Sequence, residues 1–218
     1  MDKKIDAKQA AALIKDGMTV MVGGFFALGT PKRLIDALLE GGTKDLTIIS
    51  NDAGTPDLGV GKLIAAHRVR RLVASHIGKN PLARQLMEQG RMDISLVPQG
   101  TLAERIRAAG AGLGGVLTPT GIGTEVARGK DIVVVDGKEY LLEKPIHADA
   151  ALVCGSVVDE SGNIFYRGAT RNFCPLMATA AKLVIAGAEE IVPIGAIAPE
   201  NIVTPGIFVD YIVGGEQA

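Results

Sequence analysis

The chain has 218 residues, a formal net charge of -1 and 28 glycines, and 47% of its residues are hydrophobic. This length suits one α/β domain, and we expect residues 1–218 to form a single domain. The near-zero net charge argues against nucleic-acid binding, which depends on positive charge that neutralises phosphates. The hydrophobic fraction excludes a disordered chain, and a glycine content well above the usual ~7% indicates many tight turns.

No segment of the sequence is apolar for long enough to predict a membrane span. The longest apolar stretch, residues 20–29, is about half of the ~18 residues that a transmembrane helix needs. The N-terminal segment mixes acids and bases around a short apolar core, unlike a secretory signal peptide. We therefore expect a cytoplasmic protein with no membrane partner.

Short β-branched runs alternate with helical patterns along the chain, which is typical of βαβ units. In chain order the expected elements are a helix at 6–15, a strand at 19–23, a helix from Pro31 to Gly41-Gly42, strands at 46–50 and 70–75, a helix at 82–89, a strand at 94–97, a helix at 102–109 and a strand at 183–186. The predicted fold class is an open, doubly wound α/β sheet, mostly parallel, with helices on both faces.

Residues 132–142 break this alternation. Two apolar runs flank Asp136-Gly137, a pair that favours the two-residue turn of an antiparallel hairpin. We therefore expect the sheet to be mixed.

Two glycine patterns resemble nucleotide-binding motifs but lack the required context. Residues 110–115 match G-x-G-x-x-G, yet a predicted helix precedes them and Pro119 follows closely, whereas the dinucleotide fingerprint needs a strand before and a helix after. They predict a helix stop instead. Gly61-Lys62 and Gly78-Lys79 lack the first glycine and the Ser/Thr of a P-loop. We expect neither NAD binding nor nucleoside triphosphate hydrolysis.

Residues 23–31, Gly-Gly-Phe-Phe-Ala-Leu-Gly-Thr-Pro, lie between a predicted strand and a predicted helix. Open α/β sheets bind ligands at this carboxyl edge. Gly23, Gly24 and Gly29 allow a close backbone approach, and the N–H groups of the loop and of the helix after Pro31 can cradle an anion such as a pyrophosphate. The length of the segment favours a ligand site over a plain turn.

Carboxamides follow two other predicted strands, Asn51 after the second and Gln99 before the helix at 102–109. An amide offers two N–H donors without a charge, which suits it to polarise a carbonyl or thioester oxygen. The alternative is a cap or turn role for each.

The cysteines and histidines do not predict a metal or a nucleophile. Cys154 and Cys174 are interpreted as reduced, buried thiols. His67, His76 and His147 have no partner at a diagnostic spacing and are interpreted as structural.

Several ordered blocks resemble the alpha subunits of family I CoA-transferases of the 3-oxoacid type, over nearly the full length. The blocks are Asp16-Gly17, Gly23-Gly24-Phe25, Gly29-Thr30-Pro31, residues 74–78, Asn80-Pro81, residues 97–110, 117–121 and 123–124, Gly162-Asn163, Ala169, residues 171–173 and residues 204–208. The sequence departs from the usual pattern at residues 154–156, at Cys174 and at residues 186–188, which leaves the acyl preference open.

The resemblance implies a ping-pong reaction that moves CoA from a short-chain acyl-CoA (acetyl-, butyryl- or acetoacetyl-CoA) to a free carboxylate through a glutamyl-CoA thioester. It places the glutamate in a Ser-Glu-Asn-Gly motif of a beta subunit, and this chain lacks that motif. An α2β2 assembly is expected, with CoA as a substrate and with no metal or permanently bound cofactor.

The resemblance also implies roles for particular residues. It predicts CoA contacts for Gly24, Phe25, Phe26, Ala27, Leu28, Gly29 and Thr30, and it places Asn51 and Gln99 at the thioester. A non-catalytic α/β module that binds an anion or CoA is the alternative.

Overall fold

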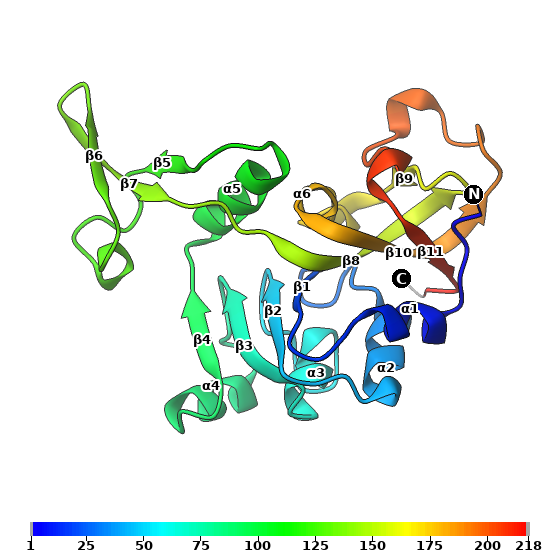
Figure 1. Cartoon of the computed structure of the whole chain (residues 1–218), viewed down its shortest axis with the longest axis horizontal. Helices are drawn as coiled ribbons and strands as arrows, with labels where there is room; N and C mark the ends of the chain where they lie inside the picture. The colour runs from blue at the N-terminus through cyan, green and yellow to red at the C-terminus, as the bar shows by residue number, and fades with distance from the viewer. Residues whose placement is uncertain (1, 217–218) are drawn as a thin grey trace.

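A computed structural model of the chain describes residues 2–216 and shows an open α/β sheet covered by helices on both faces (Figure 1). The main sheet contains β1 (Thr19–Val22), β2 (Leu46–Ser50), β3 (Val69–Ala74), β4 (Asp93–Leu96), β8 (Ala148–Asp159), β9 (Ile164–Phe165), β10 (Ala181–Val192) and β11 (Tyr211–Gly214). Their order is β11-β10-β8-β1-β2-β3-β4, with all neighbours parallel, and β9 pairs antiparallel with β8. The predicted fold class is confirmed.

Two apolar cores lie on opposite sides of this sheet. The helices α1 (Ala7–Leu13), α2 (Lys32–Gly41), α3 (Val60–Ala65) and α4 (Pro81–Glu88) contribute to one core, and α5 (Gln99–Gly110) and α6 (Cys174–Thr179) contribute to the other. Strand β1 shows the division, because Val20 and Val22 belong to the first core and Met21 to the second. Successive side chains of a strand point to opposite faces, so one short strand supports both cores.

Local signals place the helix ends close to their predicted positions. Asp6 and Gln9 form a capping box at the start of α1, and Asn80 caps α4 by accepting from the Ala83 N–H. Pro31 precedes α2, which ends at Gly42 in the left-handed conformation (φ 76°). Short 3-10 turns complete the chain: η1 (Glu125–Ala127), η2 (Gly168–Thr170), η3 (Pro199–Asn201) and η4 (Gly206–Phe208).

The strands β8 and β10 are the longest of the sheet and lie side by side. The sequence prediction covered only residues 183–186 of β10 and missed β8. Small residues dominate β8 and most of them are buried, so the strand lacks the alternation of polar and apolar residues that marks an exposed sheet. Gly155 belongs to this pattern, because a Cβ there would lie 2.3 Å from the Ile164 Cγ2 atom of β9.

The predicted hairpin forms, but it does not join the main sheet. Strands β5 (Val116–Thr118), β6 (Ile132–Val135) and β7 (Lys138–Glu143) build a separate antiparallel sheet in the order β5-β7-β6. Asp136 and Gly137 both have positive φ (51° and 74°), as the tight turn requires. The mixed character of the main sheet comes from β9 instead. We call residues 116–143 the arm.

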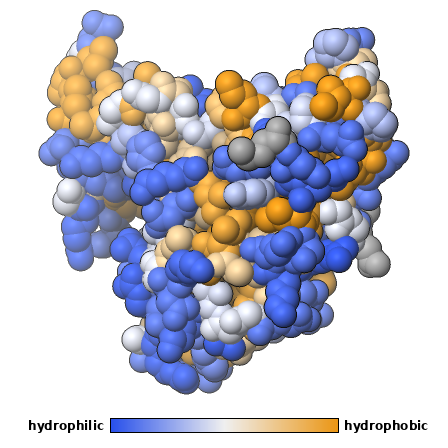
Figure 2. Space-filling model, turned by 45° about the vertical axis from the view of Figure 1, so that its right-hand side comes forward, coloured by the Kyte–Doolittle hydropathy of each residue, from blue (hydrophilic) through white to orange (hydrophobic). Residues whose placement is uncertain are grey.

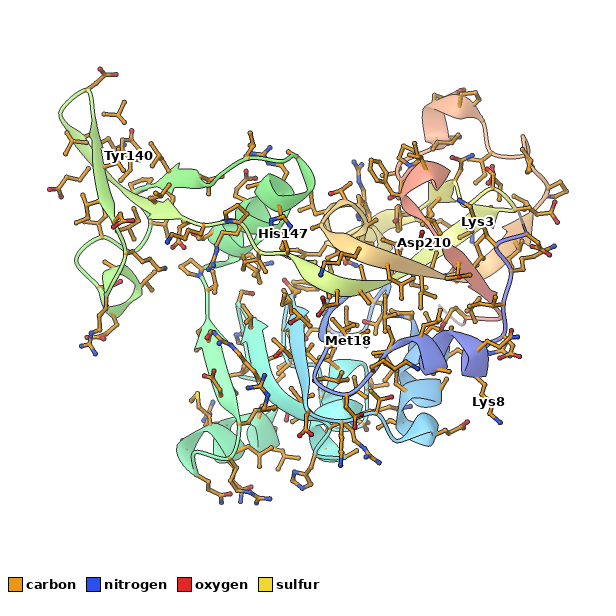
Figure 3. The ribbon with its side chains drawn as sticks, viewed as in Figure 1. Lys3, Lys8, Met18, Tyr140, His147 and Asp210 are labelled. Carbon is orange, nitrogen blue, oxygen red and sulfur yellow. The ribbon has the colours of Figure 1, made fainter. Side chains whose placement is uncertain are left out.

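The arm projects from the body at the upper left of Figure 1, and Figure 3 shows Tyr140 on it at a distance from His147, which lies at the start of β8. Apolar side chains gather on the arm in Figure 2, among them Ile132 and Val134, which are 52% and 62% exposed.

Residues 110–115 behave as the predicted helix stop. Helix α5 ends at Gly110 and the next element is strand β5, so no helix opens after the glycines. Gly110 also permits the contact between α5 and α6, since a Cβ there would lie 1.9 Å from the Thr179 Oγ1 atom. Among residues 2–216, no helix has the length and apolar character to cross a membrane.

Candidate active site

Polar side chains from three strand ends meet at the carboxyl edge of the sheet. The Gln99 Nε2 donates a hydrogen bond to the Asn51 Oδ1. The Ser75 hydroxyl, directly after β3, lies within hydrogen-bonding distance of the Gln99 Oε1 and, at 2.7 Å, of the Asn51 backbone carbonyl. The structure thus joins the two carboxamides that the sequence analysis singled out. We call Asn51, Ser75 and Gln99 the amide cluster.

The amide cluster keeps hydrogen-bond donors that its own contacts do not use. The Asn51 Nδ2 donates to the Asp52 Oδ2 at 2.7 Å, and Asn51 is only 2% exposed. Gln99 is exposed at the start of α5. A carboxamide carries two N–H bonds and each of these side chains uses one, but only Gln99 is exposed, so only Gln99 presents a second donor at the surface.

Asp52 anchors the loop that follows β1. It is 5% exposed, its Oδ2 accepts from the Phe26 N–H at 3.0 Å, and its Oδ1 accepts from the Gly54 N–H at 2.7 Å. Together with the bond from Asn51, these contacts occupy both carboxylate oxygens. Asp52 therefore serves as a structural anchor rather than a free nucleophile.

The segment 23–30, which we call the glycine loop, folds into a tight turn. Phe25 and Leu28 exchange two backbone hydrogen bonds of 3.0 Å, and Phe26 and Ala27 between them have positive φ (45° and 70°). Phe25 and Leu28 are 42% and 52% exposed, whereas Gly24 and Thr30 at the base are buried. The exposed tip is the part of the loop that a large ligand can reach.

Residues near α6 hold the opposite side of the glycine loop. The Asn172 Oδ1 accepts from the Gly24 N–H at 3.0 Å, and its Nδ2 donates to the Leu28 carbonyl at 3.1 Å. The Cys174 Sγ donates to the Gly29 carbonyl at 3.5 Å. The glycine loop is thus fixed between the end of β2 and the start of α6.

Both cysteines are free and buried, as predicted. Burial raises the pKa of the Cys174 thiol to about 12 and also raises the pKa of the Cys154 thiol. Neither thiol is a thiolate near neutral pH, so neither has the reactive form that nucleophilic chemistry requires.

Most of the backbone N–H groups that were predicted to cradle a ligand anion are engaged within the protein. The N–H groups of Gly23, Gly24, Phe25, Phe26, Leu28 and Thr30 all bond to acceptors within the protein. The N-terminus of α2 is also occupied, because the Glu216 carboxylate accepts from the Arg33 N–H at 2.9 Å and from the Leu34 N–H at 3.3 Å. The anion at this helix end belongs to the chain itself.

Positive charge reaches the loop tip from another element. The Lys79 ammonium lies 4.2 Å from the centre of the Phe26 ring, a cation–π contact. His76 packs against the same ring at 6.0 Å in an edge arrangement, which fits its interpretation as a structural residue. The lysine places a cation beside the exposed part of the glycine loop.

The four loops that follow β1, β2, β3 and β4, residues 23–31, 51–59, 75–80 and 97–99, contain no glutamate, whereas Glu160 and Glu216 follow β8 and β11. The acids of the four loops are Asp52, which is fully engaged, and the exposed Asp57, which accepts from the Thr55 hydroxyl at 2.8 Å. Among residues 2–216, no group of three metal-ligating side chains converges. These four loops present amide donors and a shaped loop, and they contain no glutamate.

Asn51 and Gln99 are recognisable in the sequence from their positions at strand ends, whereas the bond between them depends on the tertiary fold. Ser75 follows a strand end, the same signal that marked Asn51, and it was noted only as part of a family block. Asn172 carries no local signal, because its contact with Gly24 spans 148 positions of the chain.

The fold and the amide cluster define an α/β protein with a ligand site at the carboxyl edge of its sheet. The family model for coenzyme A transferases matches residues 4–215. The chain is 49% identical over 216 residues to acetate CoA-transferase subunit alpha of Escherichia coli (strain K12), covering 99% of this chain and 98% of that protein. It is 51% identical over 211 residues to the acetoacetyl-CoA:acetate/butyrate CoA transferase alpha subunit of Clostridium acetobutylicum, covering 97% of each.

A solved structure gives the same result. The acyl-CoA transferase of E. coli O157:H7, in a thioester complex with CoA, superposes with a TM-score of 0.84 at 25% identity, covering 98% of this chain and 47% of that one. This chain therefore belongs to the coenzyme A transferase family, and the family resemblance seen in the sequence is confirmed.

Proposed function

We propose that this chain is the alpha subunit of a cytoplasmic CoA-transferase that moves CoA between a short-chain acyl-CoA and a free carboxylic acid. The observation that carries the proposal is the amide cluster beside the glycine loop, where the exposed Gln99 retains an N–H donor. The relatives named for acetate, butyrate and acetoacetyl-CoA support acetyl-, butyryl- and acetoacetyl-CoA as the substrates.

The amide donors suit the chemistry of a thioester. When a carboxylate attacks the thioester carbonyl, negative charge develops on the carbonyl oxygen, and positioned N–H donors stabilise that charge. Gln99 is exposed and can reach an incoming thioester, while the buried Asn51 accepts from the Gln99 amide and holds it in place. In this proposal the tip of the glycine loop, residues 25–29, contacts CoA, and Thr30 supports the loop from below.

The nucleophile in this proposal is a glutamate of a beta subunit. Its carboxylate attacks the thioester carbon, the C–S bond breaks, and an acyl-glutamyl anhydride and CoA thiolate result. The thiolate attacks the glutamyl carbonyl, which forms the glutamyl-CoA thioester and releases the first acid. The second acid reverses both steps. The absence of glutamate from the four edge loops supports a nucleophile on the partner.

A site divided in this way needs at least one alpha and one beta subunit, and the family resemblance favours an α2β2 assembly. Two alpha and two beta subunits, α2β2, give two complete sites, each at an alpha–beta contact. CoA is a substrate that leaves with the product, so the proposed reaction needs no permanently bound cofactor.

Label exchange tests the proposal. Purified chain, alone and co-expressed with its beta subunit, is incubated with an acyl-CoA and labelled acetate. We expect labelled acetyl-CoA from the complex and none from the chain alone. Exchange at full rate by the chain alone would contradict a nucleophile on the partner. A complex that binds CoA but exchanges no label would favour the non-catalytic module.

A further inference from the structure

A small apolar pocket lies directly beside the amide cluster. It has a volume of about 270 Å³ and is lined by Phe25, Gln99, Ala103, Asn172, Phe173 and Leu176. Three elements build it: the glycine loop, one face of α5, and the start of α6, which packs against α5 (Figure 1). We infer that this pocket binds the acyl chain of the substrate, an inference that rests on the proposed CoA transfer.

The Gln99 amide, which can bind a polar group of the ligand, lies at one end of the pocket. Gln99 and Ala103 are one helical turn apart on α5, so they lie on the same face and are separated by about 6 Å along the helix axis. Gln99 belongs to the amide cluster and Ala103 packs against the second apolar core. A thioester carbonyl at Gln99 therefore directs its alkyl chain past Ala103.

The remaining lining offers nothing to a polar ligand. Asn172 uses its Oδ1 on the N–H groups of Gly24 and Phe173, and its Nδ2 lies within 3.1 Å of three backbone carbonyls. Phe173 and Leu176 present only hydrocarbon. The pantetheine arm of CoA carries two amides that would lack partners here, and burying an unpaired amide is unfavourable. An alkyl chain needs no such partners.

The volume suits a short chain. The pocket is open to solvent on one side, and its volume of about 270 Å³ exceeds the ~150 Å³ of an enclosed cavity that accommodates benzene, so a butyryl chain fits in it. Ala103 and Leu176 set this room, because both are only partly buried and pack at the edge of the core. A larger residue at Ala103 shortens the space, and a smaller one at Leu176 extends it.

The test compares acyl-CoA donors in the assembled enzyme, with labelled acetate as the common acceptor. Ala103→Leu is expected to lower kcat/KM for butyryl-CoA about tenfold or more relative to that for acetyl-CoA, because pocket methylenes discriminate at that level. Leu176→Ala is expected to raise kcat/KM for hexanoyl-CoA relative to butyryl-CoA by about tenfold. Each ratio is measured within one preparation, so partial loss of folded or assembled enzyme cancels.

Ala111→Leu is the matched control, since Ala111 is exposed at the far end of α5, and it is expected to leave both ratios unchanged. If the wild-type complex transfers CoA but neither pocket variant shifts its ratio, the acyl-chain inference is overturned. That result includes a uniform loss for all donors. If the wild-type complex transfers no CoA from any donor, the proposed function itself fails.

Discussion

The Phe26 backbone N–H donates to the Asp52 Oδ2 at 3.0 Å, and this bond ties the tip of the glycine loop to the end of β2. Phe26 has φ 45°, and a left-handed conformation costs a non-glycine residue about 1–2 kcal/mol. The buried side chain of Asp52 accepts from the Phe26 N–H and so holds Phe26 in this left-handed conformation. The glycine loop therefore owes its shape to contacts as well as to its glycines.

Replacement of Asp52 tests this anchoring. Asp52→Ala leaves the Phe26 and Gly54 N–H groups without their acceptor, so the free energy of unfolding should fall by about 1–3 kcal/mol. The KM for acyl-CoA should rise in the assembled enzyme, because the loop tip loses its fixed position. Urea denaturation and steady-state kinetics measure the two effects. Asp57→Ala, at an exposed position of the same loop, should change neither quantity appreciably.

Gln99 is the predicted donor to the thioester oxygen. Gln99→Ala should lower kcat of the assembled enzyme by about 10²-fold or more, as loss of one oxyanion donor does elsewhere, with a much smaller change in KM for acyl-CoA. Gln89→Ala, at the exposed end of α4, is the control. Equal effects of Gln99→Ala on kcat and on CoA binding would indicate a binding role instead.

Glu216 should make stability depend on pH. Burial raises the pKa of its carboxyl above the ordinary value of 4.5, against the opposing effect of the Arg33 and Leu34 N–H donors. A raised pKa favours the protonated form in the folded chain, so its stabilisation is complete below pH 4.5 and is lost as the pH rises through the folded pKa. Glu216→Gln does not titrate and should gain stability relative to wild type over that rise.

Thermal unfolding of the wild type and of Glu216→Gln between pH 4 and pH 8 measures the difference in stability between them. The contributions of the other titrating groups cancel in this difference. Glu125→Gln, an exposed exchange in η1, should show no such trend. A wild-type chain that gains stability over Glu216→Gln with rising pH would mean that the N–H donors outweigh burial.

The thiols should be inert in the folded chain. Cys154 and Cys174 are buried, and the pKa of Cys174 is raised to about 12, so a thiol reagent at pH 8 should modify neither residue at an appreciable rate. In urea both should react. Mass spectrometry before and after denaturation counts the modified thiols, and rapid modification of the native chain would contradict this burial.

The local parts of the fold were predictable from the sequence. Turn and cap residues act over a few positions, so Asp136-Gly137 predicted its hairpin, Gly42 ended α2, and the glycines at 110–115 marked a helix stop. The position of the glycine loop followed from the strand before it and the helix after it. The positions of Asn51 and Gln99 next to predicted strand ends also indicated them as candidate site residues.

The strand order and the contacts between segments far apart in the sequence were not predictable from local patterns. Strand β1 lies between β2 and β8, and nothing in its four residues specifies the second neighbour. The occupation of the α2 N-terminus was not predictable for the same reason, since Glu216 reaches α2 from a segment remote in sequence. Local pattern shows which groups can donate, whereas only the tertiary fold shows which are already engaged.

The central claim is that this chain supplies the amide donors and the beta subunit supplies the nucleophile. The most direct measurement is intact-mass spectrometry of both subunits after the complex is incubated with acyl-CoA in the absence of an added acid. We expect the mass of CoA, bound as a thioester, on the beta subunit and an unmodified alpha chain. A covalent CoA adduct on the alpha chain, with the beta subunit unmodified, would contradict this claim.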